Sequence, residues 1–184
     1  ASVVLAEAPQ KHEINTLVVD VGTNAEIVVG NSKRMLAASS PTGPAFEGAQ
    51  ISSGQRAAPG AIERIRIDKD TLEPCFRVIG VEQWSNEDDF DEKIKSTGIT
   101  GICGSGIIEV LAEMYLSGIL STDGVIDGTV AARTPRIEED HRTFAYRVAE
   151  NVIVTQHDVR AIQLAKAALH AGLRLLMDKM ELKK

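Results

Sequence analysis

The sequence predicts an α/β fold, and three observations support this class. The first part of the chain contains three short runs rich in β-branched and small apolar side chains, which are typical of strands. Two later segments, 105–118 and 155–180, repeat apolar residues every three or four positions, which indicates amphipathic helices. The length of 184 residues, with 43% hydrophobic and 25% charged residues, suits one large domain or two small subdomains of a soluble globular protein.

The first part of the chain is predicted to form a hairpin and a third strand. A turn at Gly22–Ala25 separates two runs of strand-forming residues, so these runs should pair with each other. The third run leads into a loop of Ser, Pro, Thr and Gly residues, which favour turns over regular structure. In chain order we expect strands at 15–21, 26–30 and 34–38, a loop at 39–44 and a short helix within 45–54.

The middle of the chain is predicted to form a second unit rich in strands. The polar and acidic segment 85–95 interrupts it and should form a solvated loop or a short surface helix, to which no function is assigned. The expected strands lie at 61–67, 76–81, 125–136, 143–148 and 151–154.

Start and stop signals frame the two helices. Ser105 is placed to cap the first helix, and Gly118 is its stop signal. The second helix begins with a Thr-x-x-Asp sequence, Thr155 to Asp158, which resembles a capping box. Its apolar stripe needs a partner, so we expect a missing lobe, or a second copy of this chain in a homodimer, to cover it.

Charge and cysteine content exclude several classes of function. The net charge of -6 is spread along the chain, which argues against a nucleic-acid partner. The apolar stretch 107–120 contains two glutamates and is shorter than the about 20 residues that a membrane span requires. Because Cys75 and Cys103 are far apart, we expect no disulfide framework and no zinc or iron-sulfur ligand set. A reducing, cytoplasmic location fits this composition, and a start at Ala1 instead of Met indicates a segment excised from a longer protein.

The hairpin turn is the first candidate site. Asp20, Gly22, Thr23 and Asn24 follow a predicted buried strand, where their backbone and side-chain groups would face outward together. Gly22 permits close approach of a ligand, hydroxyl and amide groups bond phosphate oxygens, and the Asp20 carboxylate can hold a water of hydrated Mg²⁺. The alternative is a turn in which Asp and Asn only cap the backbone.

A glycine-rich sequence at the start of the first long helix is the second candidate site. Unpaired N–H groups and the positive end of the helix dipole would face an anion near Gly101–Gly106. The sequence matches neither a Walker loop nor a dinucleotide fingerprint. Close helix packing is the alternative use of these glycines. Cys103 beside them has no base nearby in sequence that would support a nucleophilic role.

Other polar residues carry less information. Glu47 and Arg56 lie in loops among Gly and Pro residues, which routine turns would also explain. Lys166 is adjacent to an apolar stripe and receives no role. The 4 histidines lack the spacing of metal ligands, so we expect no protein-held transition metal.

Taken in order, five segments of the chain resemble the ATPase domain of the reductive activators of corrinoid proteins. That family is similar to the superfamily of actin, heat-shock chaperones and sugar kinases. The resemblance implies an actin-like, ribonuclease H-like lobe with an inserted strand-rich subdomain. It covers nearly the whole chain, and its segments are 20–30, 43–48, 56–63, 101–106 and 155–160 with 164–166.

The resemblance also implies a division of the chain and a reaction. Residues 1–58 would begin the lobe and carry its phosphate-binding hairpin, 59–154 would form the inserted subdomain with helix 105–118, and 155–184 would be the linking helix that returns to the lobe. In this family, an added N-terminal iron-sulfur domain supplies electrons that reduce a Co(II) corrinoid to Co(I). ATP binding and hydrolysis drive that uphill transfer.

Roles for individual residues follow from the resemblance. Asp20 would be the catalytic residue and would orient Mg²⁺ through water. The implied partners are ATP and a corrinoid protein that serves a methyltransferase. The nucleotide contacts would come from Gly22, Thr23, Asn24, Gly43, Glu47, Gly104, Ser105 and Gly106.

The chain departs from the family pattern at several points. Ala25 stands where relatives often have Gly, and no Asp-x-Gly-Thr-Thr motif precedes the hairpin. No Gly-Gly-Phe-Gly-type adenosine loop follows Lys184, and the iron-sulfur cysteines are missing. Because a nucleotide held between two lobes needs both, we expect the segment alone to bind ATP weakly or not at all and not to hydrolyse it. Micromolar ATP binding in calorimetry would refute this.

Two other interpretations of the same segments stay open. The chain can be a docking module for the corrinoid partner, with Arg56 on the docking surface. It can also be part of a small-molecule kinase or of an acyl-CoA-type activator from the same superfamily.

Overall fold

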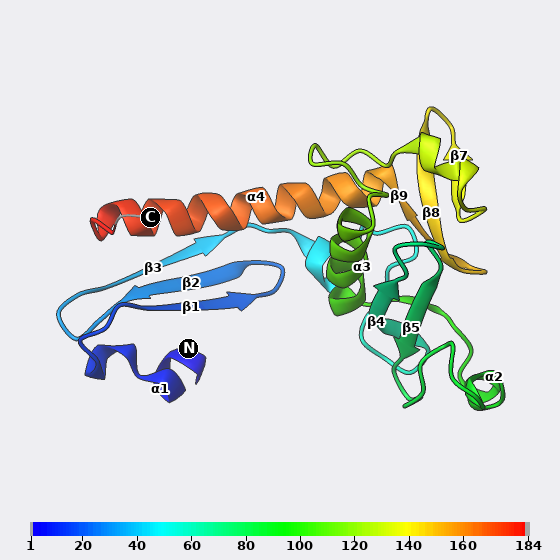
Figure 1. Cartoon of the computed structure of the whole chain (residues 1–184). Coiled ribbons are helices and arrows are strands. Elements are labelled where there is room, and N and C mark those ends of the chain that lie inside the picture. Colours follow the sequence, from blue (N-terminus) through cyan, green and yellow to red (C-terminus); the bar gives the residue numbers. More distant parts are fainter. Residues whose placement is uncertain (1, 183–184) are drawn as a thin grey trace. The chain divides into compact units, whose positions relative to one another are not determined.

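A computed structural model of the chain describes residues 2–182, which form two compact units (Figure 1). Unit 1 combines the chain up to Pro44 with the chain from Leu164 onward, and unit 2 consists of residues 45–163. These boundaries differ from the predicted ones at 58/59 and 154/155, because the loop 45–58 and the start of the last helix pack with unit 2. The assignment of a lobe and an inserted subdomain stays a prediction.

Unit 1 is built on a three-stranded antiparallel sheet with the order β1-β2-β3. The strands are Thr16–Val21, Ala25–Gly30 and Met35–Ser40, which confirms the predicted hairpin and third strand. A short helix α1, Ser2–Glu7, and a 3-10 turn, Pro9–Lys11, precede the sheet.

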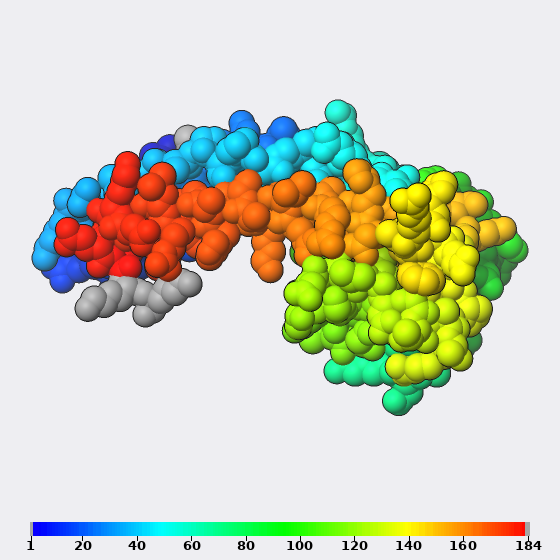
Figure 2. Space-filling model, turned by 90° about the horizontal axis from the view of Figure 1, so that it is seen from above, coloured from blue at the N-terminus to red at the C-terminus, as the bar shows by residue number. Residues whose placement is uncertain are grey.

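The last helix, α4 (Gln156–Lys179), packs its apolar stripe on one face of this sheet. Ile27 and Val29 of β2 form one buried cluster with Leu176 of α4. The Ser40 hydroxyl donates to the Ala168 carbonyl at 2.6 Å, which ties β3 to the same helix. Figure 2 shows the red C-terminal part of α4 against the blue segments of unit 1. Strands of the same chain therefore pack against this stripe, where the sequence led us to expect a missing lobe or a second copy; a homodimer stays a prediction.

Unit 2 contains two further three-stranded sheets. In the first, β4 lies in the middle and pairs antiparallel with β5 and parallel with β6. The second has the order β7-β8-β9 and is antiparallel throughout. The strands of unit 2 are Ala61–Ile67, Pro74–Val78, Gly101–Ile102, Ile137–Asp140, Thr143–Ala149 and Val152–Thr155. The predicted strands at 61–67, 143–148 and 151–154 are confirmed, and the one predicted at 76–81 begins at Pro74 and ends at Val78.

The strand predicted at 125–136 is wrong. A 3-10 helix, Gly128–Ala132, occupies this part of the chain. The Asp127 carboxylate accepts hydrogen bonds from the Thr129 N–H at 2.9 Å and the Thr129 hydroxyl at 2.7 Å. Because such local bonds compete with a sheet ladder, they favour a turn over a strand here.

Two short helices lie where the sequence predicted them. The acidic segment 85–95 contains α2, Phe90–Lys93, which a 3-10 turn at Ile94–Ser96 follows. The helix expected within 45–54 is a single 3-10 turn, Pro44–Glu47. Gly48 follows it with a φ of 82°, a left-handed conformation that ends the turn.

Helix α3, Gly104–Leu116, packs along β4 in the core of unit 2. Ile107, Val110 and Met114 of this helix are fully buried. The prediction that Ser105 caps the helix is wrong, because the N-cap position is Cys103 and Ser105 lies inside the first turn.

The other two helix signals are confirmed. The Gly118 N–H, at a φ of 79°, donates to the Tyr115 carbonyl at 3.2 Å, which is half of a Schellman motif. At the start of α4, the Asp158 carboxylate accepts the Thr155 N–H at 2.8 Å, and the Thr155 hydroxyl accepts the Asp158 N–H at 3.2 Å. This reciprocal pair is the capping box that the sequence indicated. Across residues 2–182, no helix has both the length and the apolar character that a membrane span needs.

Candidate functional site

The tip of the β1-β2 hairpin is a tight connection of three residues. Val21 and Ala25 form the last cross-strand pair, and Gly22, Thr23 and Asn24 link them. The Gly22 N–H donates to the Asn24 carbonyl at 3.0 Å, which closes the turn. Ala25 is fully buried, whereas the Thr23 and Asn24 side chains at the tip are exposed.

The loop after β3 holds this tip in place. Thr42, which is only 6% exposed, donates its hydroxyl hydrogen to the Gly22 carbonyl at 2.7 Å, and its oxygen lies 3.1 Å from the Thr23 carbonyl oxygen. The Gly43 N–H donates to the Thr23 carbonyl at 2.9 Å. Gly43 has a φ of 73°, which favours glycine at this position. The structure therefore brings Gly43 to the hairpin, and it adds Thr42, which no sequence motif singled out.

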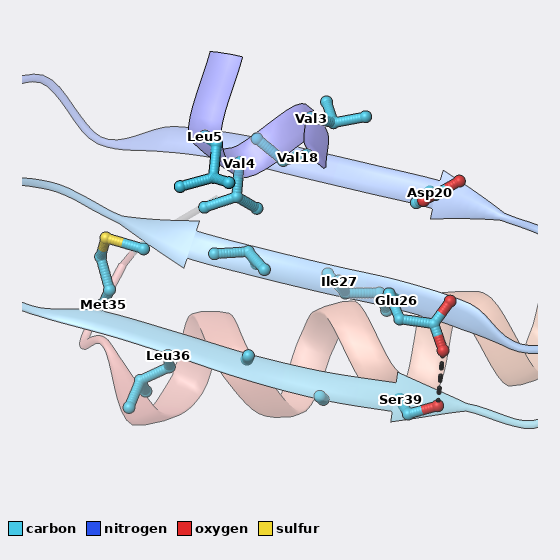
Figure 3. A pocket seen from close by; sticks show the side chains of 13 residues that line it. Val3, Val4, Leu5, Val18, Asp20, Glu26, Ile27, Met35, Leu36 and Ser39 are labelled. Carbon is cyan, nitrogen blue, oxygen red and sulfur yellow. Dashed lines mark hydrogen bonds between the residues drawn. The ribbon is translucent and has the colours of Figure 1, made fainter. Parts of the chain in front are cut away.

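Asp20 lies in a polar row across one face of the sheet. The strand register places Asp20 opposite Glu26, and Glu26 opposite Ser39, so their side chains project from the same face. The Ser39 hydroxyl donates to the Glu26 carboxylate at 3.1 Å. These three side chains line one end of a cavity of about 650 Å³, whose other walls are apolar and include residues of α1 (Figure 3).

A cation at the polar row stays a prediction. Within residues 2–182, no three side chains of His, Cys, Asp or Glu gather in a group that could hold a metal ion. A cation at Asp20 would therefore keep most of its ligands as water, which is the usual state of Mg²⁺ in phosphate sites.

The start of α3 is built from close backbone contacts. A Cβ atom on Gly104 would lie 2.0 Å from the Phe46 carbonyl oxygen and 3.5 Å from the Glu47 Cα. A Cβ atom on Gly106 would lie 2.5 Å from the Ile62 carbonyl oxygen. The structure thus supports the close-packing interpretation of these two glycines and places Glu47 beside them. Anion binding by the first N–H groups of α3 stays a prediction.

The side chains around this helix start are already engaged. The Ser105 hydroxyl donates to the Glu63 carbonyl at 3.1 Å and lies 3.3 Å from the Cys103 sulfur. Cys103 is a free thiol that is only 2% exposed, so it has little access to a substrate. Arg56, which the docking-module interpretation places on its surface, is exposed, and so is Lys166, to which the sequence assigned no role.

The predicted site residues fall into two groups, one in each unit. The group in unit 1 is Asp20, Gly22, Thr23, Asn24 and Gly43. The group in unit 2 is Glu47, Gly104, Ser105 and Gly106.

Known proteins with similar sequences act on corrinoid proteins. The corrinoid activation enzyme RamQ of Eubacterium limosum is 33% identical over 180 residues, which are 91% of this chain and 28% of RamQ. The Co(II) methylated amine-specific corrinoid protein reductase of Methanosarcina barkeri is 32% identical over 114 residues, which are 57% of this chain and 20% of that protein.

A solved structure and a family profile agree with these relatives. The structure of a reductive activator for corrinoid, iron-sulfur protein matches with a TM-score of 0.81 at 33% identity, over 99% of this chain and 28% of that one. This confirms the actin-like ATPase fold that the sequence motifs implied. The chain spans 28% of the length of RamQ and of this activator. Residues 14–184 match the family described as the C-terminal domain of RACo, the ASKHA domain, and the chain therefore belongs to that family.

Proposed function

We propose that the chain supplies one side of the Mg²⁺ and phosphate site of an ATP-dependent corrinoid activator. The observation that carries this proposal is the hairpin tip, where Asp20, Thr23 and Asn24 are exposed while Thr42 and Gly43 hold the backbone beneath them. The names of the relatives support the corrinoid part of the proposal, because they describe corrinoid activation and corrinoid reduction.

Each residue of the tip has a proposed task. Asp20 orients Mg²⁺ through a water molecule, and the side chains of Thr23 and Asn24 donate hydrogen bonds to phosphate oxygens. Gly22 lets the phosphates approach the backbone. When bound with Mg²⁺, ATP would supply, through its binding and hydrolysis, the free energy that drives one electron from the iron-sulfur part of a longer protein onto Co(II) of the corrinoid protein, which gives Co(I).

The residues at the start of α3 contribute differently. Gly104, Ser105 and Gly106 offer the N–H groups of the first helical turn, which have no acceptor within the helix. The Ser105 side chain does not bind the phosphate in this proposal, because its hydroxyl already donates to the Glu63 carbonyl. Gly43 lies in the loop that supports the hairpin tip, and Glu47 lies in the loop that packs beside Gly104.

The chain's own cysteines do not fit an iron-sulfur cluster. Cys103 is only 2% exposed, and the Cys75 thiol donates to the Asn86 side-chain oxygen at 2.9 Å. We therefore place the electron source, and the second side of the nucleotide site, in other parts of a longer protein. The chain alone would bind ATP weakly and would not hydrolyse it. The two free thiols fit a reducing, cytoplasmic location.

An optical assay of corrinoid reduction tests the proposal. It uses a protein of the relatives' full length that contains this chain, and it follows the conversion of Co(II) to Co(I) with and without ATP. We expect Asp20→Asn to lower the ATP-dependent rate about 100-fold, because a water-mediated Mg²⁺ contact loses its charge. The control is Asp178→Asn, which removes a carboxylate of unit 1 that pairs with Arg174 at 3.2 Å on the surface of α4.

Two results would contradict the proposal. An unchanged rate in Asp20→Asn would remove the hairpin from the ATP site. If the chain nevertheless captured the corrinoid protein, and Arg56→Ala abolished this capture, the docking-module interpretation would replace the ATP-site proposal.

A further inference from the structure

Within the described part of the chain, one edge of β4 lacks a neighbouring strand over most of its length. β4 pairs with β5 along one edge, but on the other edge it pairs with β6 only at Ala61 and Ile62. Beyond Ile62, α3 lies along β4 (Figure 1). The backbone groups of that edge therefore need partners from outside the sheet, since unpaired backbone groups at a partly buried edge are costly.

Three side chains of α3, spaced four residues apart, meet alternate residues of this edge. One is a hydroxyl that donates to a carbonyl, and two are carboxylates that accept from N–H groups. The three bonds are Ser105 Oγ to Glu63 O at 3.1 Å, Ile65 N to Glu109 Oε2 at 2.7 Å and Ile67 N to Glu113 Oε2 at 3.0 Å.

The geometry of helices and strands explains why the three bonds form together. Four residues of an α-helix advance about 6.0 Å, and two residues of a strand advance about 6.6 Å, so the two repeats nearly match. A slide of α3 by one residue along β4 would break all three bonds. The side chains of α3 therefore take the place of a strand and select one register.

The two carboxylates are held in this arrangement by arginines of β4. Glu109 accepts hydrogen bonds from Arg64, at 3.1 Å, and from Arg66. Glu113 lies 4.0 Å from Arg66. Burial alone would raise the pKa of Glu109, but the hydrogen bonds from Arg66, from the Ile65 N–H and from Arg64 hold it below its ordinary value. Both side chains are largely shielded, with 21% and 18% of their surfaces exposed.

We infer that Glu109 and Glu113 are positioning residues that determine where α3 begins. The Phe46 and Ile62 carbonyl oxygens stop the helix start from moving closer at Gly104 and Gly106. The three bonds to β4 stop it from sliding away. Together they set the place of the first N–H groups of α3. That these N–H groups bind phosphate rests on the proposed function. The alignment of α3 along β4 is independent of that function.

Amide hydrogen exchange on the 184-residue chain tests the register. We expect Glu109→Ala to speed exchange at the Ile65 N–H at least about tenfold and to leave the Ile67 N–H nearly unchanged. Glu113→Ala should do the reverse. Glu109→Gln should keep most of the protection, because its side-chain oxygen still accepts the bond. The control, Glu92→Ala on α2, should change neither amide.

A second measurement tests whether Glu113 fixes the position of the start of α3 or only supports the backbone next to it. In Glu113→Ala, the amide NMR signals of Gly104 and Gly106 should shift, although these residues lie at the opposite end of α3. In Glu113→Gln, the same signals should have the positions they have in the unmodified chain. If the alanine variant does not fold, Glu113→Asp, which is one methylene shorter, takes its place.

The outcomes are distinct. Unprotected Ile65 and Ile67 amides in the unmodified chain would overturn the inference. So would unchanged Gly104 and Gly106 signals in a variant that has lost protection at Ile67. Because no nucleotide is present in either measurement, these results are independent of the Asp20→Asn assay, which tests the proposed function.

Discussion

The hairpin tip and the start of α3 are both candidate phosphate contacts, but they are built in opposite ways. At the tip, the polar side chains of Asp20, Thr23 and Asn24 are exposed, and Thr42 holds the Gly22 carbonyl beneath them. At the start of α3, Gly104 and Gly106 leave no room for a methyl group, and the Ser105 hydroxyl is bonded to the chain itself. The comparison predicts two different responses to mutation. Substitutions that remove a polar group should harm the tip most, whereas substitutions that add atoms should harm the start of α3 most.

The largest expected effect on stability is that of Gly104→Ala. The new Cβ would lie 2.0 Å from the Phe46 carbonyl oxygen, and a backbone atom cannot move away cheaply. We expect the free energy of unfolding, measured with urea, to fall by about 3 kcal/mol. The matched control is Gly118→Ala, where the new Cβ meets no described atom beyond its chain neighbours within 4 Å and only the left-handed φ of 79° opposes the change, at a cost of about 1 kcal/mol. Equal losses in the two variants would contradict the close packing at α3.

Thr42→Val probes the support of the hairpin tip. Valine keeps the shape of threonine but cannot donate to the Gly22 carbonyl, so the partly buried carbonyl loses its partner. We expect the free energy of unfolding to fall by about 1 kcal/mol. Thr16→Val in the same sheet serves as a control, because its hydroxyl makes only an exposed contact of 3.4 Å with the Ile14 carbonyl. A Thr42→Val protein as stable as the control would mean that the tip does not depend on this bond.

The pH dependence of stability tests the contribution of the Glu109 carboxylate, which joins α3 to β4. The pKa of Glu109 is lower in the folded chain than its ordinary value, so the unfolded chain binds this proton more readily. The stability that Glu109 contributes is therefore present above about pH 4.5 and is lost as the pH falls through its lower folded value. We expect the loss to amount to about 1 kcal/mol, given the partly exposed position.

Urea midpoints from pH 6 down to about pH 3 measure this effect. Glu109→Gln should show a shallower fall than the unmodified chain, because glutamine does not titrate. Parallel curves for the two proteins would contradict the role of the Glu109 charge at the edge of β4.

Local signals in the sequence predicted local structure well. The capping box of Thr155 and Asp158 and the stop at Gly118 involve residues within a few positions of each other, so both are visible in the sequence. The β1-β2 hairpin has the same property, because a short turn joins two runs of strand-forming residues.

Three features that the sequence did not predict depend on residues that are distant along the chain. Ser105 lies inside the first turn of α3 instead of capping it, and its hydroxyl is bonded to the Glu63 carbonyl, 42 positions away. The apolar stripe of α4 is covered by β2, which contributes Ile27 to the shared cluster. At the candidate site, the motif around Asp20 was visible, but the bond from Thr42 was not, because no local pattern distinguishes one loop threonine from another.

The central claim is that the hairpin tip contributes side chains to phosphate binding, whereas the start of α3 contributes only backbone N–H groups. The ATP-dependent reduction of a Co(II) corrinoid protein, compared between Asp20→Asn and Ser105→Ala in one protein of the relatives' length, tests it most directly. We predict about a 100-fold loss for Asp20→Asn and a change within about twofold for Ser105→Ala. An active Asp20→Asn protein, or an equally large loss in Ser105→Ala, would contradict the claim.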